Sequence, residues 1–313
     1  MQRKIATTFS LLIIVYFCTS FRTDILHTTS PKQNTLRTIV IDAGHGGKDF
    51  GAKGAYSYEK NVTLAIALKL QATLQQALPD VKIVMTRTTD VFDDPRVKAN
   101  KANSAKGDLF LCIHCNAAPA IKHSEQIGTK TETYYTGKGS KRKKHTKKVP
   151  TYHVWYTPNP AAGTETYIWG AQKNDNKEVA MQENESLYID SSLAQQVSDF
   201  DPSSPEKMIL YSLKTQQYFQ RSANLALDVE NEFEKIGRAS RGAKQRQVGI
   251  WVLQATAMPS ILVETGYITN PQEEDYLNSI DGQQQICDAV TKAVQHYKVA
   301  LETNTFQTIS DSE

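Results

Sequence analysis

Four side chains that can bind a metal ion or move a proton stand at the boundaries of predicted elements. His45 follows the apolar run in "TIVIDAGHGG", and His114 ends the run "DLFLCIH". Glu264 ends "SILVE", and Glu59 opens the helical stretch that follows the first strand. Ligands of open α/β sheets bind beyond the carboxyl ends of the strands. We therefore expect these four side chains to meet at one rim of a sheet.

Two imidazoles and one carboxylate are typical of a catalytic zinc site, because they leave one tetrahedral position for water. Zinc lowers the pKa of that water from about 15.7 toward 7. A second carboxylate close to the water can take its proton and return it later. The glycines around His45 allow a sharp turn and keep bulk away from the ring and a substrate.

Each residue taken alone has a simpler interpretation. A single histidine at a strand end is more often a hydrogen-bonded structural residue. A glutamate at a helix start, such as Glu59, is favoured by the helix dipole whatever its function. Glu264 differs, because a carboxylate directly after "PSILV" is costly to bury without a partner. The combination of the four carries the prediction.

The motif "CIHC" does not predict a cysteine-rich zinc site. Side chains alternate along a strand, so Cys112 and His114 share one face and Cys115 points to the other. We expect both cysteines to be small packing residues. Cys18 leaves with the predicted export signal, and the odd number of cysteines that remains is not the disulfide framework of a small secreted domain.

The surrounding sequence alternates between strand and helix patterns, which predicts an α/β domain with a largely parallel sheet. Strands are predicted at 38–44, 81–87, 107–114, 163–170 and 259–271, and helices at 58–78, 96–105, 205–236 and 283–301. The first helix spaces Ile66, Leu70, Leu74 and Leu78 on one apolar face. The last two long helices show the same spacing, with Leu225, Val229, Phe233 and Ile236 in one and Ile286, Val290, Val294, Tyr297 and Leu301 in the other.

A basic insertion at about 120–162 interrupts this pattern. It is rich in Lys, Gly, Pro and Thr and contains "TGKGSKRKKHTKKVP", so we expect a partly mobile surface segment. Its basic run can attract an anionic polymer, although a solvated loop is the simpler interpretation. The polar tail, 302–313, is expected to be loose.

The first 22 residues have the pattern of an export signal: a basic start, a short apolar run and then small residues. The apolar run is short for a bilayer span, and an uncleaved anchor is the alternative. An exported chain would work in the periplasm or cell envelope. Nucleic acid is not an expected partner, because the net charge is only +3 and the sequence has no nucleic-acid-binding motif.

Six blocks between residues 37 and 300 resemble, in order, those of zinc-dependent N-acetylmuramoyl-L-alanine amidases. The blocks are "IVIDAGHGGKDFGAKG", "EKNVTLAIALKL", "VMTRTTD", "DLFLCIHCNA", "GTETYIWG" and "VLQATAMPSILVETGYITNPQEEDYL". Their order makes the resemblance much more specific than any single motif. It implies one α/β catalytic domain over residues 37–301, with helices flanking a mainly parallel sheet of about six strands.

The resemblance also implies roles for residues of this sequence. His45, Glu59 and His114 match the ligands of one Zn²⁺ ion, and Glu264 matches the catalytic glutamate. Asn116 matches a position near the site and is a candidate for substrate binding. The implied substrate is peptidoglycan, cut at the amide between the lactyl group of N-acetylmuramic acid and L-alanine. Such cleavage serves wall remodelling or daughter-cell separation. Zinc would polarise the carbonyl, and Glu264 would carry the proton from water to the departing amine.

Some amidases of this family carry an inhibitory helix that covers the zinc until an activator protein displaces it. The acidic segment 176–206 lies where such an element occurs, and Glu183 or Glu185 is placed to reach the metal. A solvated surface helix is the alternative.

Two other functions are compatible with the same residues. A wall-binding or regulatory protein could keep this scaffold with catalysis lost, but an intact Glu264 beside an intact ligand set speaks against it. A zinc peptidase acting within the stem peptide would use the same metal chemistry, and only the family blocks argue against it.

Overall fold

The computed structural model describes residues 35–169, 205–246 and 250–307, and for 205–217 and 246 it describes the backbone alone. The chain divides into two units, 1–35 and 36–313, and almost all described residues belong to the second. The predicted export signal, Glu183 and Glu185 lie outside the described residues.

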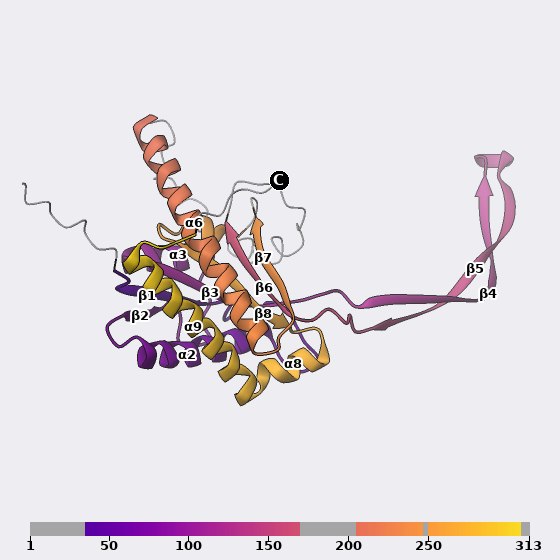
Figure 1. The fold of residues 1–313 in the computed structure, drawn as a ribbon. Helices are drawn as coiled ribbons and strands as arrows, with labels where there is room; N and C mark the ends of the chain where they lie inside the picture. Colours follow the sequence, from indigo (N-terminus) through magenta and orange to yellow (C-terminus); the bar gives the residue numbers. More distant parts are fainter. Residues whose placement is uncertain (1–34, 170–204, 247–249, 308–313) are drawn as a thin grey trace, which may run out of the picture. The chain divides into compact units, whose positions relative to one another are not determined.

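A six-stranded sheet forms the centre of the domain, in the order β2-β1-β3-β8-β6-β7 (Figure 1). Its strands are β1 (Thr38–Ala43), β2 (Lys82–Met85), β3 (Leu109–Asn116), β6 (Thr164–Trp169), β7 (Ser240–Arg246) and β8 (Ser260–Tyr267). The first four in this order run parallel, whereas β6 runs antiparallel to β8 and parallel to β7. The expectation of a mainly parallel sheet of about six strands is confirmed.

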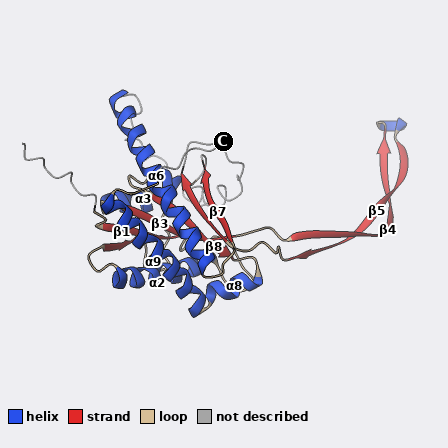
Figure 2. Cartoon of the chain, viewed as in Figure 1, coloured by secondary structure: helices blue, strands red, loops and turns tan. Residues whose placement is uncertain are grey.

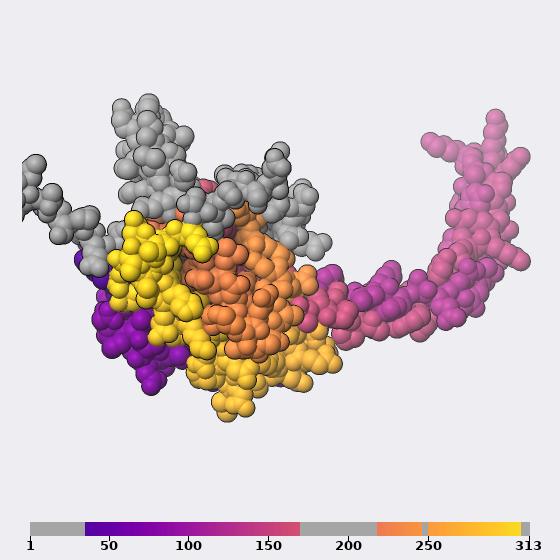
Figure 3. Space-filling model, viewed as in Figure 1, coloured from indigo at the N-terminus to yellow at the C-terminus, as the bar shows by residue number. Residues whose placement is uncertain are grey.

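Helices cover both faces of the sheet. They are α2 (Glu59–Ala77), α3 (Pro95–Ser104), α6 (Pro205–Lys235), α7 (Trp251–Ala255), α8 (Pro271–Asn278) and α9 (Ile280–Thr303). Residues of α2, α6, α8 and α9 share one apolar cluster with one face of the sheet, and residues of α3 and α7 share a second cluster with the other face. Figure 3 shows α6 and α9 side by side, in orange and yellow.

The helical spacing read from the sequence matches the observed core. Ile66, Leu70 and Leu74 of α2 are fully buried, and Leu225, Val229 and Phe233 of α6 are equally inaccessible. The predicted apolar residues of α9 are buried as well. Every residue of β1 and β3 is buried, as expected for parallel strands with helices on both faces.

Alternation along the central strands decides which face carries the candidate site. Leu111 and Ile113 of β3 belong to the cluster with α2 and α9, whereas Phe110 and Cys112 belong to the cluster with α3 and α7. His114 therefore points to the α3 and α7 side, at the carboxyl end of its strand.

The basic insertion forms an antiparallel hairpin, which corrects the expectation of a loop (Figure 2). Strands β4 (Ile121–Thr136) and β5 (Lys143–Thr157) are joined through a short 3₁₀ turn at Gly139–Lys141. Threonine, tyrosine and valine favour strands, but the lysine runs and proline of the insertion obscured that signal. Its surface position agrees with the prediction, since no residue of either strand is buried.

Strand β7 and helices α7 and α8 were not predicted. The sequence of β7, "SRGAKQR", lacks an apolar alternation because it is an edge strand, and edge strands commonly carry charged residues. Helix α7 is only five residues long, too short for a periodic pattern. No helix in the described ranges has the length and apolar composition needed to cross a membrane.

Candidate metal centre

A tight turn after β1 places His45 at the rim of the sheet. His45 has a φ of +56°, a left-handed conformation that is uncommon outside glycine. Reciprocal backbone hydrogen bonds between Gly46 and Asp49 close the turn. Buried Arg87 donates to the carbonyls of Ala43 and Gly44, so it fixes this turn.

Asp49 orients the His45 ring. Its Oδ2 lies 3.0 Å from His45 Nδ1, and on the other side of the ring Nε2 lies 3.1 Å from Oε2 of Glu59. Burial alone would raise the pKa of Asp49, but the hydrogen bond and charge of His45 lower it below its ordinary value. Sequence reasoning missed Asp49, although an acidic residue four positions after a candidate ligand in a glycine-rich turn is a usable signal, because ligand histidines commonly hydrogen-bond a carboxylate.

Glu59 is fully buried at the first position of α2, where both of its oxygens are held. Oε2 accepts the backbone N–H of Ala52 at 2.8 Å, and Oε1 accepts that of Cys115 at 2.9 Å. Oε1 also lies 3.0 Å from Nδ1 of His114. Burial would raise the pKa of Glu59, but the two imidazoles lower it well below its ordinary value. The carboxylate is therefore ionised.

The donor atoms of His45, Glu59 and His114 all lie within 4.8 Å of one another. The two imidazole rings meet edge to face, with centroids 4.9 Å apart. These three buried residues can therefore bind a metal ion, and their nitrogens and oxygens match the preference of zinc.

Two glycines leave the space that this arrangement needs. A Cβ on Gly44 would lie 2.5 Å from Nε2 of His114, and one on Gly51 would lie 2.6 Å from Oε2 of Glu59. Any other residue would collide with a proposed ligand. A cavity of about 20 Å³, room for about one water molecule, adjoins His45 and His114.

Glu264 stands next to His114 across the β3–β8 pair, and Glu165 of β6 stands next to Glu264 in turn. Residues in register on neighbouring strands share a face. The row His114, Glu264, Glu165 therefore lies on one face of the sheet, near its rim. Glu264 is fully buried.

Glu165 is a residue that sequence reasoning missed. Its carboxylate accepts hydrogen bonds from the hydroxyls of Tyr167 and Tyr267 and pairs with Arg241 and Lys244. Burial would raise its pKa, but these donors lower it below its ordinary value. Its available signal was an isolated charge in the otherwise uncharged strand "TETYIW".

Asn116 lies at the end of β3, two residues beyond His114. Its Nδ2 donates to Oε2 of Glu165 at 3.3 Å, and its Oδ1 accepts the backbone N–H of Ala117. The predicted substrate-binding position is therefore connected to the row of glutamates.

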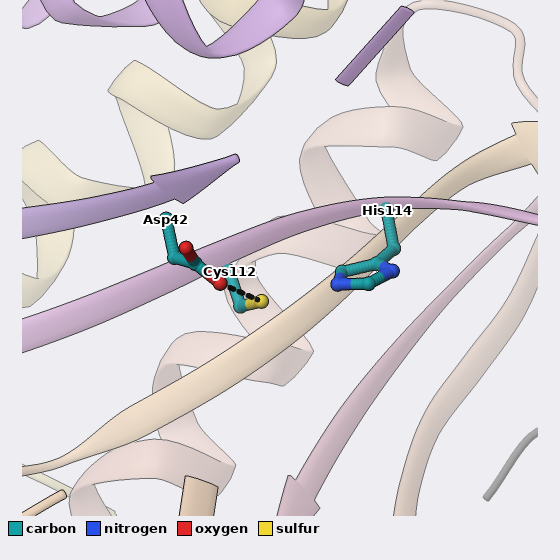
Figure 4. A group of neighbouring side chains, drawn as sticks. All are labelled: Asp42, Cys112 and His114. Carbon is teal, nitrogen blue, oxygen red and sulfur yellow. Dashed lines mark hydrogen bonds between the residues drawn. The ribbon is translucent and has the colours of Figure 1, made fainter. Parts of the chain in front are cut away.

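A second group of potential donors, Asp42, Cys112 and His114, lies on the same face (Figure 4). Cys112 donates to Asp42 across 3.0 Å, and Lys98 pairs with the same carboxylate at 3.1 Å. Burial, together with Asp42, raises the pKa of the Cys112 thiol to about 12. Because the thiol stays protonated and the carboxylate is already paired, this group fits a structural network better than a metal site. Cys112 and Cys115 are both buried in the core, as expected.

Residues 39–296 match the family described as N-acetylmuramoyl-L-alanine amidase, Amidase_3. The chain belongs to this family. The match includes all four residues singled out first in the sequence.

Named relatives agree with this assignment. The chain is 28% identical to N-acetylmuramoyl-L-alanine amidase AmiC of Escherichia coli O6:H1 over 264 residues, which cover 83% of this chain and 52% of that protein. It is 26% identical to AmiA of Salmonella typhimurium over 85% of this chain and 78% of that protein. The chain thus spans about half the length of the first of these relatives.

Solved structures share the fold. An N-acetylmuramoyl-L-alanine amidase from Clostridium difficile 630 aligns with a TM-score of 0.52 at 23% identity, covering 84% of this chain and 97% of that one. Ami1 from Mycobacterium smegmatis aligns with a TM-score of 0.51 at 14% identity, covering 86% and 99%.

Proposed function

We propose that this chain is a zinc-dependent hydrolase of peptidoglycan that cuts the amide between the lactyl group of N-acetylmuramic acid and L-alanine. The observation that carries the proposal is the convergence of His45, Glu59 and His114 at the strand-end rim, with Glu264 in register beside His114. Family membership supports the choice of bond.

His45, Glu59 and His114 would hold the zinc ion. When bound, zinc supplies a Lewis acid that polarises the amide carbonyl and makes water acidic enough to react at neutral pH. Glu264 takes a proton from water at its carboxylate and delivers it to the departing nitrogen of L-alanine. Asp49 fixes the ring of His45, and Asn116 offers an amide to orient the substrate.

Hydrolysis of purified cell-wall sacculi by the zinc-loaded protein tests the reaction. Mass spectrometry should find free amino termini on L-alanine and unsubstituted lactyl groups. The variant Glu264→Gln should lose about 10²–10⁴-fold in rate while its zinc content stays the same. The exposed substitution Glu234→Gln, in α6, serves as the matched control and should leave the rate unchanged.

The two alternatives give different results in this assay. Fragments cut within the stem peptide would show a zinc peptidase and overturn the choice of bond. A zinc-loaded wild-type protein that binds sacculi without releasing fragments would favour a catalytically inactive wall-binding or regulatory protein.

We also propose export to the periplasm or cell envelope, and inhibition by segment 176–206 until an activator protein displaces it. The support is the sequence pattern alone. Deletion of 184–200, or the pair Glu183→Gln and Glu185→Gln, should raise activity several-fold without any activator. Unchanged activity would contradict inhibition.

The export proposal has its own test. The mass of the protein recovered from its native compartment shows whether the first 22 residues have been removed.

A further inference from the structure

The β4–β5 hairpin exposes both of its faces. Its two strands pair only with each other in the described part of the chain, and none of their residues is buried. A two-stranded hairpin has little core of its own and is at best marginally stable in water. Large apolar side chains that stay exposed on such an element indicate a binding surface.

Aromatic side chains gather on this hairpin. Five of them are between 40% and 62% exposed: Tyr134, Tyr135, Tyr152, Trp155 and Tyr156. Trp155 is stacked against His123 of the opposite strand and against His153, with ring centroids 5.3 and 5.5 Å apart. These two contacts hold the indole in one orientation while it remains open to a ligand.

Positive charge gathers on the same element. Residues 121–157 contain nine Lys or Arg and two Glu. Glu132 pairs with Lys130 at 3.1 Å and lies 3.8 Å from Lys147, whereas the run Lys141–Lys144 at the turn contains no acidic residue. The guanidinium of Arg142 lies 4.0 Å above the ring of Tyr135. The hairpin therefore combines rings held for stacking with a cationic end.

We propose that the β4–β5 hairpin is a peptidoglycan-binding arm, which would recruit the proposed activity to its polymeric substrate. Exposed aromatic rings give sugar rings flat apolar surfaces. The lysines and Arg142 form charge-assisted hydrogen bonds with the carboxylates of stem peptides. The inference rests on the proposed function in one respect: that function identifies the bound polymer as peptidoglycan.

The distribution of side chains favours a glycan over a lipid surface. By the strand register, Trp155 and Tyr134 lie on one face, and Tyr135, Tyr152 and Tyr156 lie on the other. Binding to a lipid surface requires one continuous apolar face opposite a polar one. Rings divided between two faces fit separate sugar contacts instead.

Co-sedimentation with purified sacculi tests the arm. All proteins carry Glu264→Ala, so that none digests the sacculi. The aromatic variant adds Tyr152→Ala, Trp155→Ala and Tyr156→Ala, and the control variant on the same hairpin adds Thr129→Ala, Thr131→Ala and Thr133→Ala. We expect at least tenfold weaker binding for the aromatic variant and no change for the control. Equal binding by all three proteins overturns the proposal.

A charge variant gives an independent measurement that does not depend on the aromatic side chains. Replacing Lys141, Arg142, Lys143 and Lys144 by glutamine should weaken binding at low salt and reduce its dependence on salt concentration. Unchanged binding and salt dependence would contradict the charge contribution. Binding to vesicles that contain anionic lipid tests the competing interpretation. If the hairpin variants lose vesicle binding but keep sacculus binding, the hairpin is a lipid-binding surface and the proposal is wrong.

Failure of the arm and failure of the proposed function can be separated. With Glu264 intact, the aromatic variant should cleave a short soluble muropeptide at the wild-type rate and cleave sacculi several-fold more slowly. If the zinc-loaded wild type cleaves neither substrate, the proposed function is contradicted. The co-sedimentation assay still shows whether the hairpin binds sacculi, because it does not depend on cleavage.

Discussion

At the scale of single residues, the site depends on space as much as on ligands. Gly51 has a φ of +61°, and a Cβ there would lie 2.6 Å from Oε2 of Glu59 and equally close to Cδ2 of His45. The Glu59 oxygens are held by two backbone N–H groups, so they have little freedom to move aside. A methyl group at this position would therefore displace a proposed ligand.

We predict that Gly51→Ala weakens zinc binding about 10–100-fold, the range seen when groups that orient a metal ligand are disturbed. Competition with a chromophoric chelator measures the affinity. Gly139→Ala is the matched control, because Gly139 has a φ of +57° but a Cβ there meets nothing within 4 Å. Equal loss in both variants would contradict the collision with Glu59 as the cause.

At the scale of elements, α8 anchors the loop that leads into Glu59. Glu274 of α8 is buried and accepts the backbone N–H groups of Ala55, Tyr56 and Ser57 at 2.7–3.0 Å. Burial would raise the pKa of Glu274, but the Ser57 hydroxyl and these N–H groups lower it below its ordinary value of 4.5. Its stabilisation is therefore present above that value and is lost as the pH falls through the lowered pKa.

Glu274→Gln should reduce the free energy of unfolding by about 2 kcal/mol at pH 7, because charge-assisted hydrogen bonds are lost. The difference in unfolding free energy between the variant and the wild type should narrow as the pH falls below about 4.5, because the stabilisation by the ionised Glu274 carboxylate is then lost. Urea unfolding at several pH values measures both. Asp275→Asn is the neighbouring control, since among the described residues Asp275 accepts a hydrogen bond only from the exposed hydroxyl of Tyr56. If the difference in unfolding free energy between wild type and Glu274→Gln does not change with pH, the ionised Glu274 carboxylate is not the source of the stabilisation.

At the scale of the whole molecule, the proposed ligands come from three separate elements. His45 lies in the turn after β1, Glu59 opens α2, and His114 is near the end of β3. Only the folded chain brings them together. A metal ion that binds the folded state alone stabilises it by mass action.

Zinc at about 100 times its dissociation constant should add about 2.7 kcal/mol and raise the thermal unfolding midpoint by about 5–10 °C. Differential scanning fluorimetry with zinc and with chelator measures the shift. The double variant His45→Ala, His114→Ala should show none. A shift of the same size in that variant would place the bound zinc elsewhere.

Sequence alone determined the types of the reactive residues and the elements that carry them. Apolar periodicity is a local property, so Leu70 of α2 and Val290 of α9 could be assigned to the core from spacing. Abrupt ends of apolar runs pointed to His45, His114 and Glu264. The strands of the hairpin and β7 were not predicted, because lysine-rich and edge strands lack the apolar alternation that marks a half-buried strand.

Tertiary structure decided which residues meet. Registers between β3, β8 and β6 set Glu264 beside His114 and Glu165 beside Glu264, and a left-handed turn set Asp49 against His45. Strand register depends on packing between segments more than a hundred residues apart, as between His114 and Glu264. No local pattern encodes such pairings, because the burial that fixes them exists only once the sheet has formed.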